Sequence, residues 1–341
     1  MSPVRELQGT GVVTSAVGFG CAGLFRIPQR KARVAVMQAA YDAGIRHFDT
    51  APMYGLGLAE AELGAFLRLH RQDVTVTTKF GIDPTHLTRT LAPLQGPARA
   101  FLAKRPTVTE GLKTAGKDAD SGPVGRLLYS APGYHRRAAQ RSLERSLRTL
   151  GTDYIDVFLL HDPRGELMRD PVELADYLDE QCKSGRIRCW GVTGSPARLA
   201  GVLESLRWPS VIQHRDDVFS EVSGETADGA RITYGALARA VPAFGQYLAR
   251  TPGDRARWSE RLGLDLEAES ALPRLLLAAA LRRNTSGPVL FTTTRPERVA
   301  VAVSAAAEAA ADSGPSITET AAFSELIAST RAASPELAGL G

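Results

Sequence analysis

The sequence lacks a long apolar segment, a strong excess of one charge and a cysteine pattern. No hydrophobic run approaches the roughly 18 residues that a membrane-spanning helix needs. Cys21, Cys182 and Cys189 have no metal-ligand spacing, so reduced thiols are the simplest interpretation. The net charge is +4, with arginines scattered among acids, which gives no support to a nucleic-acid partner. No apolar segment follows the first charges, so we expect no signal peptide and a cytoplasmic protein.

Short β-branched segments alternate with longer segments of helical period along the 341 residues. This alternation is typical of β-α units around a parallel sheet. Eight such strands predict a single-domain (β/α)8 TIM barrel over residues 1–341, with its active site at the C-terminal strand ends. Gly44, Gly151 and Gly185 stand where helix C-caps need glycine. The predicted strands are residues 15–20, 46–50, 74–80, 154–161, 188–194, 210–215, 231–237 and 289–294.

Two stretches depart from the alternation. Residues 81–134 are rich in proline and glycine and have no convincing periodicity, although an ordinary connection needs only a few residues. They predict an insertion after the third strand that serves as a lid or substrate loop, the alternative being a disordered surface insertion. Residues 305–341 begin with an alanine-rich run and predict a helical tail that closes the barrel.

Two glycine motifs imitate phosphate-binding loops. Residues 18–23, "GFGCAG", fit G-x-G-x-x-G, and Asp49 supplies an acid at the end of the next strand. In a dinucleotide-binding turn the helix begins at the third glycine, whereas Pro28 marks helix entry about five residues later. Residues 111–118 fit G-x-x-x-x-G-K, but Asp118 replaces the Ser or Thr that holds magnesium. Neither motif therefore predicts a Rossmann turn or a P-loop.

Four side chains of different chemistry are expected at one mouth of the barrel. Asp49, Lys79 and His161 end the second, third and fourth predicted strands, and Tyr54 follows the second. Each alone has a structural explanation, as a helix cap, a surface ion pair, a core histidine or a packed ring. Because the remaining residues of these strands are apolar, packing does not explain all four together.

This set of residues suits proton transfer coupled to hydride transfer. A tyrosine acts as an acid or base at neutral pH only if its phenolate is stabilised. An ammonium about 4 Å away, at an effective dielectric of about 20, contributes on the order of 4 kcal/mol, or about three pKa units. We therefore expect Lys79 to lower the pKa of Tyr54 to about 7, with Asp49 keeping Lys79 charged. His161 would orient a substrate oxygen, and the hydride carrier must be a cofactor.

From about Val12 to Ala305 the chain resembles the aldo-keto reductases. The resemblance implies a TIM barrel with NADP or NAD extended across its mouth. It also implies a catalytic tetrad of Asp49, Tyr54, Lys79 and His161, with Tyr54 as general acid or base. The subgroup of aldose (L-fucose/D-threo-aldose) and pyridoxal dehydrogenases is the most similar, and it oxidises sugar hemiacetals or related polar aldehydes. The matching segments are "GFGCAGL", "AAYDAGIRHFDTAPMYGLGLAEAELGAFL", "TTKFG", "QRSLERSLRTLGTDYIDVFLLHDP" and "GRIRCWGVTG".

The resemblance also implies a cofactor site on the last four strands. Arg298 can bind a 2'-phosphate, so NADP is expected and NAD possible, although an exposed helix-start cation is the alternative for this residue. Gly194 replaces a usual Asn, Thr292 a frequent Lys, and Ala302 a polar residue near adenine. The implied contacts are Thr193 and Gln213 on the carboxamide, Tyr234 on the nicotinamide ring, and Thr293 and Arg298 on the adenosine phosphates.

The expected function is NAD(P)-dependent interconversion of an aldehyde, ketone or sugar hemiacetal with an alcohol or lactone. The expected partner is thus a small carbonyl or sugar substrate, with no nucleic acid, membrane or metal, and the sequence assigns no oligomeric state. The main alternative is a nucleotide-binding regulatory subunit of the same fold with slow turnover. Others are Schiff-base chemistry at Lys79 and metal-assisted hydrolysis through His161 and Asp162. Expected pocket walls are Phe25, Met53, Phe80, Tyr129 and Tyr134.

Overall fold

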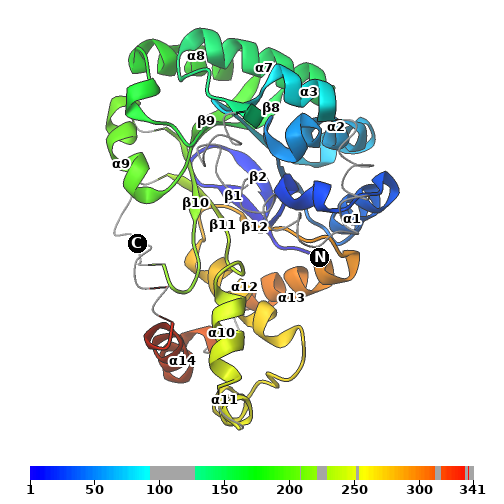
Figure 1. The fold of residues 1–341 in the computed structure, drawn as a ribbon, viewed down its shortest axis with the longest axis vertical. Coiled ribbons are helices and arrows are strands. Elements are labelled where there is room, and N and C mark those ends of the chain that lie inside the picture. Colours follow the sequence, from blue (N-terminus) through cyan, green and yellow to red (C-terminus); the bar gives the residue numbers. More distant parts are fainter. Residues whose placement is uncertain are drawn as a thin grey trace.

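Eight parallel strands close into a barrel, which confirms the predicted fold (Figure 1). The computed structural model describes residues 1–92, 127–207, 209–220, 229–250, 253–311, 316–334 and 337. Within these ranges we find no helix that combines the length and the apolar character needed to span a bilayer. All eight predicted strands are present. In the order of the closed barrel they are β10 (Val211–Arg215), β11 (Ala230–Tyr234), β12 (Val289–Phe291), β3 (Val17–Gly20), β4 (His47–Asp49), β5 (Thr75–Phe80), β8 (Ile155–His161) and β9 (Ile187–Thr193).

Helices lie on the outside of the barrel, and all of them except α13, which follows the last strand, lie between consecutive strands of the chain (Figure 1). Their ends follow local sequence signals. Asp170 accepts a hydrogen bond from the backbone N–H of Glu173 and so caps the start of one helix, and Gly151 ends another with a left-handed φ of 65°. Gly44 and Gly185, with φ of 88° and 76°, also follow helix ends as predicted. The helices are α1 (Arg30–Asp42), α2 (Ala59–His70), α7 (Arg136–Leu150), α8 (Pro171–Lys183), α9 (Pro196–Ser205), α12 (Ala271–Arg283) and α13 (Val299–Ala310).

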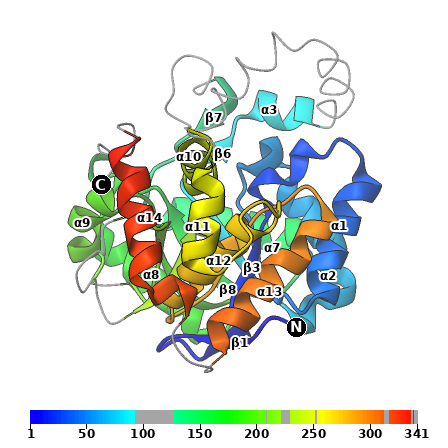
Figure 2. The ribbon, with the colours of Figure 1, turned by 90° about the horizontal axis from the view of Figure 1, so that it is seen from below.

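Three further helices form a second hydrophobic cluster beside the barrel. They are α10 (Ala240–Leu248), α11 (Asp254–Leu262) and α14 (Ala321–Ala332), and Figure 2 shows them together on one side of the molecule. Buried aromatic residues such as Phe244, Trp258 and Phe323 belong to this cluster. The expected helical tail, residues 305–341, contains the end of α13 and all of α14. Helix α13 lies against β3, whereas α14 packs on α10 and α11.

An antiparallel hairpin closes the end of the barrel at which the parallel strands begin. It consists of β1 (Val4–Leu7) and β2 (Val12–Ser15), and the sequence did not predict it. Leu7 and Val12 are buried in a cluster with interior residues of the barrel strands. Thr14 also hydrogen-bonds Thr75, the first residue of β5, with 2.7 Å between the hydroxyl oxygens. The hairpin therefore seals the end of the barrel opposite the predicted site.

The insertion after β5 begins and ends in a short ladder. Strand β6 (Asp83–Pro84) pairs with β7 (Tyr129–Ser130), and α3 (His86–Leu91) lies between them in the sequence. Residues 93–126 lie outside the described residues, as does the lysine-containing motif at 111–118. The predicted lid role of residues 81–134 therefore stays a prediction. Short 3-10 segments complete the list of elements: η1 (Cys21–Arg26), η2 (Tyr54–Gly57), η3 (Arg71–Asp73), η5 (Gly165–Leu167), η6 (Pro296–Arg298) and η7 (Ile317–Glu319).

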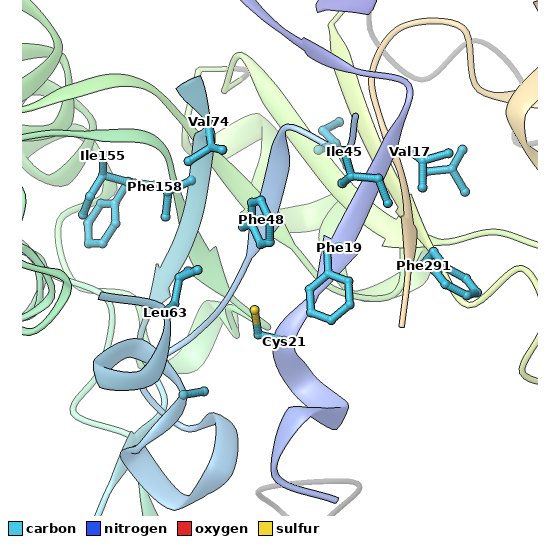
Figure 3. Packing of buried hydrophobic residues seen from close by; sticks show 14 of the residues in the cluster. Val17, Phe19, Cys21, Ile45, Phe48, Leu63, Val74, Ile155, Phe158 and Phe291 are labelled. Carbon is cyan, nitrogen blue, oxygen red and sulfur yellow. The ribbon is translucent and has the colours of Figure 1, made fainter. Parts of the chain in front are cut away.

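Aromatic and aliphatic residues fill the layer between strands and helices (Figure 3). Phe48 packs between Phe19 and Phe66, with ring centroids 5.8 and 5.2 Å apart. Because side chains alternate along a strand, the outward Val17 and Phe19 leave glycine at the neighbouring inward positions of β3.

The glycines of the G-x-G-x-x-G motif serve packing between β3 and β12. A Cβ atom on Gly18 would lie 2.7 Å from Leu290. Cβ atoms on Gly20 and Gly23 would lie 2.6 and 2.7 Å from side-chain atoms of Thr292. Helix α1 begins only at Arg30, so the motif is not a Rossmann turn, as the sequence predicted.

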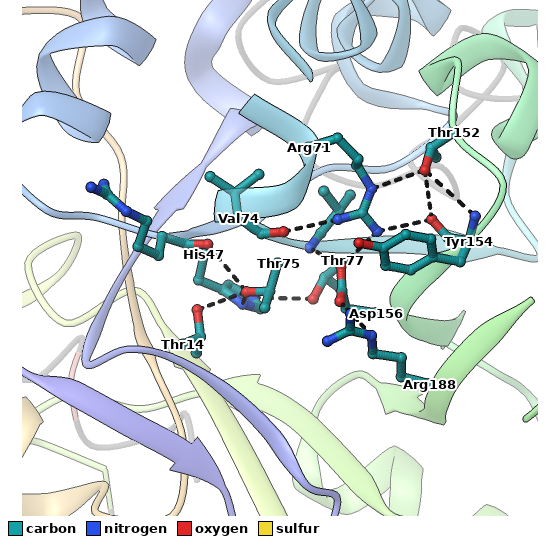
Figure 4. Close-up of polar contacts among 12 residues, drawn as sticks. Thr14, His47, Arg71, Val74, Thr75, Thr77, Thr152, Tyr154, Asp156 and Arg188 are labelled. Atoms are coloured by element: carbon teal, nitrogen blue, oxygen red, sulfur yellow. Dashed lines mark hydrogen bonds and ion pairs between the residues drawn. The ribbon is translucent and has the colours of Figure 1, made fainter. Parts of the chain in front are cut away.

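A polar network holds the N-terminal ends of β5 and β8 together (Figure 4). Asp156 accepts hydrogen bonds from Arg71 at 2.9 Å and from the backbone N–H of Val76 at 2.8 Å. The Arg71 guanidinium carbon lies 3.7 Å from the centre of the Tyr154 ring. Since Asp156 is near the start of β8 and His161 is at its end, this network belongs to the scaffold.

Candidate active site

The structure brings Asp49, Tyr54, Lys79 and His161 together at the mouth of the barrel formed by the C-terminal ends of the strands. Asp49 is the last residue of β4, Lys79 the penultimate residue of β5 and His161 the last residue of β8. These three strands are consecutive neighbours in the barrel. Tyr54 opens η2, the turn that follows β4. The parallel arrangement therefore places all four on one rim, as the sequence predicted.

Lys79 and Asp49 form a buried ion pair. The Nζ atom of Lys79 donates to both carboxylate oxygens of Asp49, at 2.7 and 2.8 Å, and to the backbone oxygen of Thr50 at 2.9 Å. The two residues are only 1% and 3% exposed. Burial lowers the pKa of Lys79, and the charge of Asp49 opposes this shift. The three acceptors match the three N–H bonds of a protonated ammonium.

Tyr54 lies above this ion pair and beside His161. Its ring centre is 5.0 Å from Nζ of Lys79, and its ring meets that of His161 edge-on, with centroids 6.0 Å apart. Burial, followed by the charge of Asp49, raises the pKa of Tyr54 well above its usual value. The expected pKa near 7 is therefore wrong in direction. Asp49 neutralises the ammonium that was expected to stabilise the phenolate, and desolvation acts on the phenolate as well.

His161 is held as a neutral imidazole. Burial, and next the positive charge of Lys79, lowers the pKa of His161 to about 3. Its Nδ1 atom is buried and has no hydrogen-bond partner among the described residues. A neutral imidazole can donate or accept one hydrogen bond, so His161 can orient a substrate oxygen but does not act as a strong acid.

Three predicted cofactor residues lie on the next strands around the barrel, Thr193 and Tyr234 at strand ends and Gln213 in the middle of its strand. Thr193, Gln213 and Tyr234 stand on β9, β10 and β11, on the same rim as the four residues above. The side-chain nitrogen of Gln213 donates to Asp49 at 2.7 Å, so one of its two N–H bonds is already used. A Cβ atom on Gly194 would lie 3.2 Å from the carboxylate of Asp162, which occupies the space beside this position.

Thr293 and Arg298 follow β12. The hydroxyl of Thr293 accepts from the backbone N–H of Arg295 at 3.1 Å and so closes a tight turn. Arg298 forms an ion pair with Glu269 at 3.1 Å, and both side chains are largely exposed. The guanidinium of Arg298 therefore lies at the surface, in the 3-10 segment η6 that follows β12.

Comparison with known proteins assigns the chain to one family. The model of the Aldo/keto reductase family matches residues 16–215, more than half of the chain and including all of Asp49, Tyr54, Lys79 and His161. The chain belongs to the aldo/keto reductase family. This confirms the resemblance stated from the sequence motifs.

Two curated relatives of this aldo/keto reductase are dehydrogenases of the expected subgroup. D-threo-aldose 1-dehydrogenase from Pseudomonas sp is 38% identical over 158 residues, which cover 45% of this chain and 41% of the relative. Pyridoxal 4-dehydrogenase from Microbacterium luteolum is 33% identical over 167 residues, or 47% and 43% of the two chains. The chain thus matches about two fifths of the length of each relative.

Solved structures extend the similarity of the fold over the whole barrel. The glycerol dehydrogenase from Gluconobacter oxydans has a TM-score of 0.65 at 18% identity and covers 97% of this aldo/keto reductase and 95% of its own chain. An aldo-keto reductase from Klebsiella pneumoniae, solved in complex with NADPH, has a TM-score of 0.60 at 20% identity, with 90% of each chain covered.

Three of the expected pocket walls belong to the core of this aldo/keto reductase. Phe80 is fully buried and stacks on Phe158, with ring centroids 5.1 Å apart. Tyr134 is 1% exposed, and its hydroxyl donates to the backbone oxygen of His161 at the end of β8. Phe25 is also mostly buried, under Gly55, whereas Met53 and Tyr129 are partly exposed. Position in the sequence could not distinguish a wall from the core because both lie near strand ends.

The contact from Gln213 to Asp49 is the functional feature that the sequence did not indicate. The two residues are 164 positions apart, and no motif joins them. The predicted metal alternative finds no support in the pairing of Asp162, whose carboxylate accepts from Arg198. Among the described residues, no three His, Cys, Asp or Glu side chains come together as a metal site.

Proposed function

We propose that this aldo/keto reductase interconverts a carbonyl compound and the corresponding alcohol or lactone, using NADP(H), with Tyr54 as the proton donor. The observation that supports this most strongly is the Tyr54 ring, whose centre lies 5.0 Å from the buried ammonium of Lys79 and which meets the imidazole of His161 edge-on. A bound nicotinamide nucleotide supplies the hydride, which no protein side chain can provide.

Tyr54 is suited to donate a proton and is less suited to remove one. Its raised pKa keeps the phenol protonated at neutral pH, ready to protonate a carbonyl oxygen. The neutral His161 beside it can hydrogen-bond the same oxygen and fix its direction. Lys79 and Asp49 form a buried ion pair next to the Tyr54 ring. The reductive direction is therefore the one that these four residues favour at neutral pH.

The residues at the strand ends fit a nicotinamide nucleotide. Thr193 and Gln213 offer a hydroxyl and an amide oxygen for a carboxamide, and Tyr234 offers an aromatic face on the neighbouring strand. Arg298 is held only by an exposed ion pair to Glu269 and can be redirected to a phosphate. Its charge favours NADP over NAD because a 2'-phosphate adds a dianion at this edge.

The proposed substrate class is a polar aldehyde or an aldose. This rests on the two curated relatives reported above, which are named D-threo-aldose 1-dehydrogenase and pyridoxal 4-dehydrogenase.

A panel of aldoses, pyridoxal and aromatic aldehydes, assayed in both directions with NADPH and NADH, tests the proposal. We expect turnover with at least one polar aldehyde, faster with NADPH. The Tyr54→Phe variant should lose at least about a hundredfold in turnover, the usual contribution of a general acid. It should still bind the nucleotide, as measured by fluorescence quenching. Tight nucleotide binding with negligible turnover would instead support the regulatory-subunit alternative. Borohydride trapping of a carbonyl substrate at Lys79 without nucleotide would support Schiff-base chemistry.

A further inference from the structure

Tyr134 places its hydroxyl against the main chain at the tip of β8. The hydroxyl donates to the backbone oxygen of His161 at 2.6 Å and lies 3.2 Å from that of Asp162. The tyrosine is 1% exposed and belongs to the segment that leads from β7 into α7. The contact therefore reaches the candidate substrate-orienting residue from outside the barrel.

The surroundings of Tyr134 fix its ring in this place. Its backbone N–H donates to the oxygen of Leu167 at 3.0 Å, and its own oxygen accepts from the N–H of Arg169 at 3.1 Å. The ring occupies the space beside Gly81, where a Cβ atom would lie 2.1 Å from the tyrosine ring. Phe80 packs on the ring with centroids 6.1 Å apart. A side chain bound on both sides in this way has little freedom to move.

The tip of β8 needs such a support because its chain turns sharply there. Asp162 has a φ of 55°, a left-handed conformation that residues other than glycine rarely adopt. Its backbone N–H donates to the oxygen of Thr193 at 2.7 Å, which holds the inner side of the turn. The hydroxyl of Tyr134 holds the two carbonyl groups on the other side.

The imidazole of His161 depends on this main-chain support. A functional histidine is usually oriented through a hydrogen bond from its second ring nitrogen. In His161 the buried Nδ1 has no such partner among the described residues. The direction of the ring is thus set by its own backbone and by the edge contact with Tyr54.

We propose that Tyr134 is a positioning residue that holds His161 in its productive orientation through the carbonyl groups of β8. The proposal rests on the function proposed above and adds a residue that does not touch the substrate. Loss of its hydroxyl should leave the nucleotide site intact, since Tyr134 contacts none of the proposed nucleotide-binding residues through a hydrogen bond in the described part of the chain.

The test compares Tyr134→Phe with Tyr177→Phe. Tyr177 in α8 is the matched control. Its hydroxyl is also buried, but it has no hydrogen-bond partner among the described residues. We expect Tyr134→Phe to lower kcat for aldehyde reduction about tenfold, since small misplacements of catalytic groups cost one to two orders of magnitude. KM for NADPH should change less than about twofold, and Tyr177→Phe should leave kcat unchanged. An active wild type with full activity in Tyr134→Phe overturns the inference and leaves the proposed function standing.

The same substitution in a His161→Ala background separates positioning from general loss of structure. If Tyr134 acts through His161, Tyr134→Phe has no further effect on kcat there, because the ring that it positions is gone. An equal tenfold loss in both backgrounds would contradict the proposal.

Side-chain NMR of histidine gives a readout that requires no turnover. The ring signals of His161, assigned by their loss in His161→Ala, should shift in Tyr134→Phe and stay in place in Tyr177→Phe. Unchanged signals in Tyr134→Phe would reject the positioning role even if no substrate were found. Absence of turnover in the wild type, with shifted signals, would reject the proposed function alone.

Discussion

The side chain of Gln213 donates a hydrogen bond to Asp49 across the barrel, with 2.7 Å between Nε2 and Oδ2. Strands β10 and β4, which carry the two residues, are four strands apart in either direction around the closed barrel. The same carboxylate oxygen accepts from Lys79 at 2.8 Å. The Gln213 side-chain amide thus connects the Lys79–Asp49 pair to the opposite wall of the barrel. This bond is made in addition to any contact between Gln213 and a nucleotide.

Replacement of Gln213 should change stability in the absence of nucleotide. Gln213→Leu removes a buried donor to a charged acceptor, so the free energy of unfolding should fall by about 1.5–3 kcal/mol. Gln213→Glu should cost more at neutral pH because it places a second carboxylate against Asp49. Urea unfolding of the nucleotide-free protein measures both changes. Unaltered stability with weaker nucleotide binding would mean that Gln213 serves the carboxamide alone.

The pH dependence of carbonyl reduction tests the protonation states of the site. The pKa of Tyr54 lies well above 10, and a proton donor loses activity only as the pH rises through its pKa. His161, with a pKa of about 3, stays neutral at all higher pH values. We therefore expect kcat with NADPH to be flat between about pH 6 and 9. A decline in kcat centred near pH 7 would restore the sequence-based expectation of an acidified phenol.

Periodicity and strand-end chemistry were enough to predict the barrel and its four-residue cluster. The eight strands were identifiable because each is short, β-branched and bounded by turn residues, and parallel strands must expose their C-terminal ends on one rim. Asp49, Lys79 and His161 could be placed together for this reason without any knowledge of side-chain contacts.

The protonation state of Tyr54 and the hydrogen bonds of Tyr134 and Gln213 were not predictable from the sequence. The first depends on the balance between desolvation and an ammonium already paired with Asp49, which requires three-dimensional distances. The others depend on hydrogen bonds between residues far apart in the chain. The N-terminal hairpin was missed as well, because its strands carry no clear alternation of apolar and polar residues.

Two buried histidines should make the protein less stable in mild acid. Burial lowers the pKa of His47 and of His161 to about 3, against an ordinary value of 6.5. As the pH falls below about 6.5, the unfolded chain therefore binds these protons first. The free energy of unfolding therefore falls as the pH decreases from 6.5 towards 3. Each histidine contributes up to about 1.4 kcal/mol per pH unit to this loss.

His47→Asn should reduce this slope. His47 is fully buried, with its ring nitrogens 3.0 and 3.1 Å from the hydroxyls of Thr75 and Thr77, so the substitution also lowers stability at every pH. That constant loss does not affect the slope. Unfolding free energies measured between pH 5.5 and 4 should vary by about 1.4 kcal/mol per unit less than in the wild type. His161→Asn should show a similar reduction, and an unchanged slope in both variants would contradict the assigned protonation states.

The nucleotide preference should depend on Arg298 and on its partner Glu269. Their ion pair is exposed, with 3.1 Å between the nitrogen and the oxygen, and such pairs contribute about 0–1 kcal/mol. Arg298→Ala should therefore leave stability almost unchanged but weaken NADPH binding about tenfold or more, with little effect on NADH, because a charge-assisted bond to the 2'-phosphate is lost. Glu269→Gln removes the competing carboxylate and should tighten NADPH binding by up to about fivefold. Arg274→Ala, which breaks a comparably exposed pair with Glu308 at 3.2 Å, is the matched control and should alter neither dissociation constant. Fluorescence titration with both nucleotides decides the point, since equal losses for NADPH and NADH in Arg298→Ala would place the 2'-phosphate elsewhere.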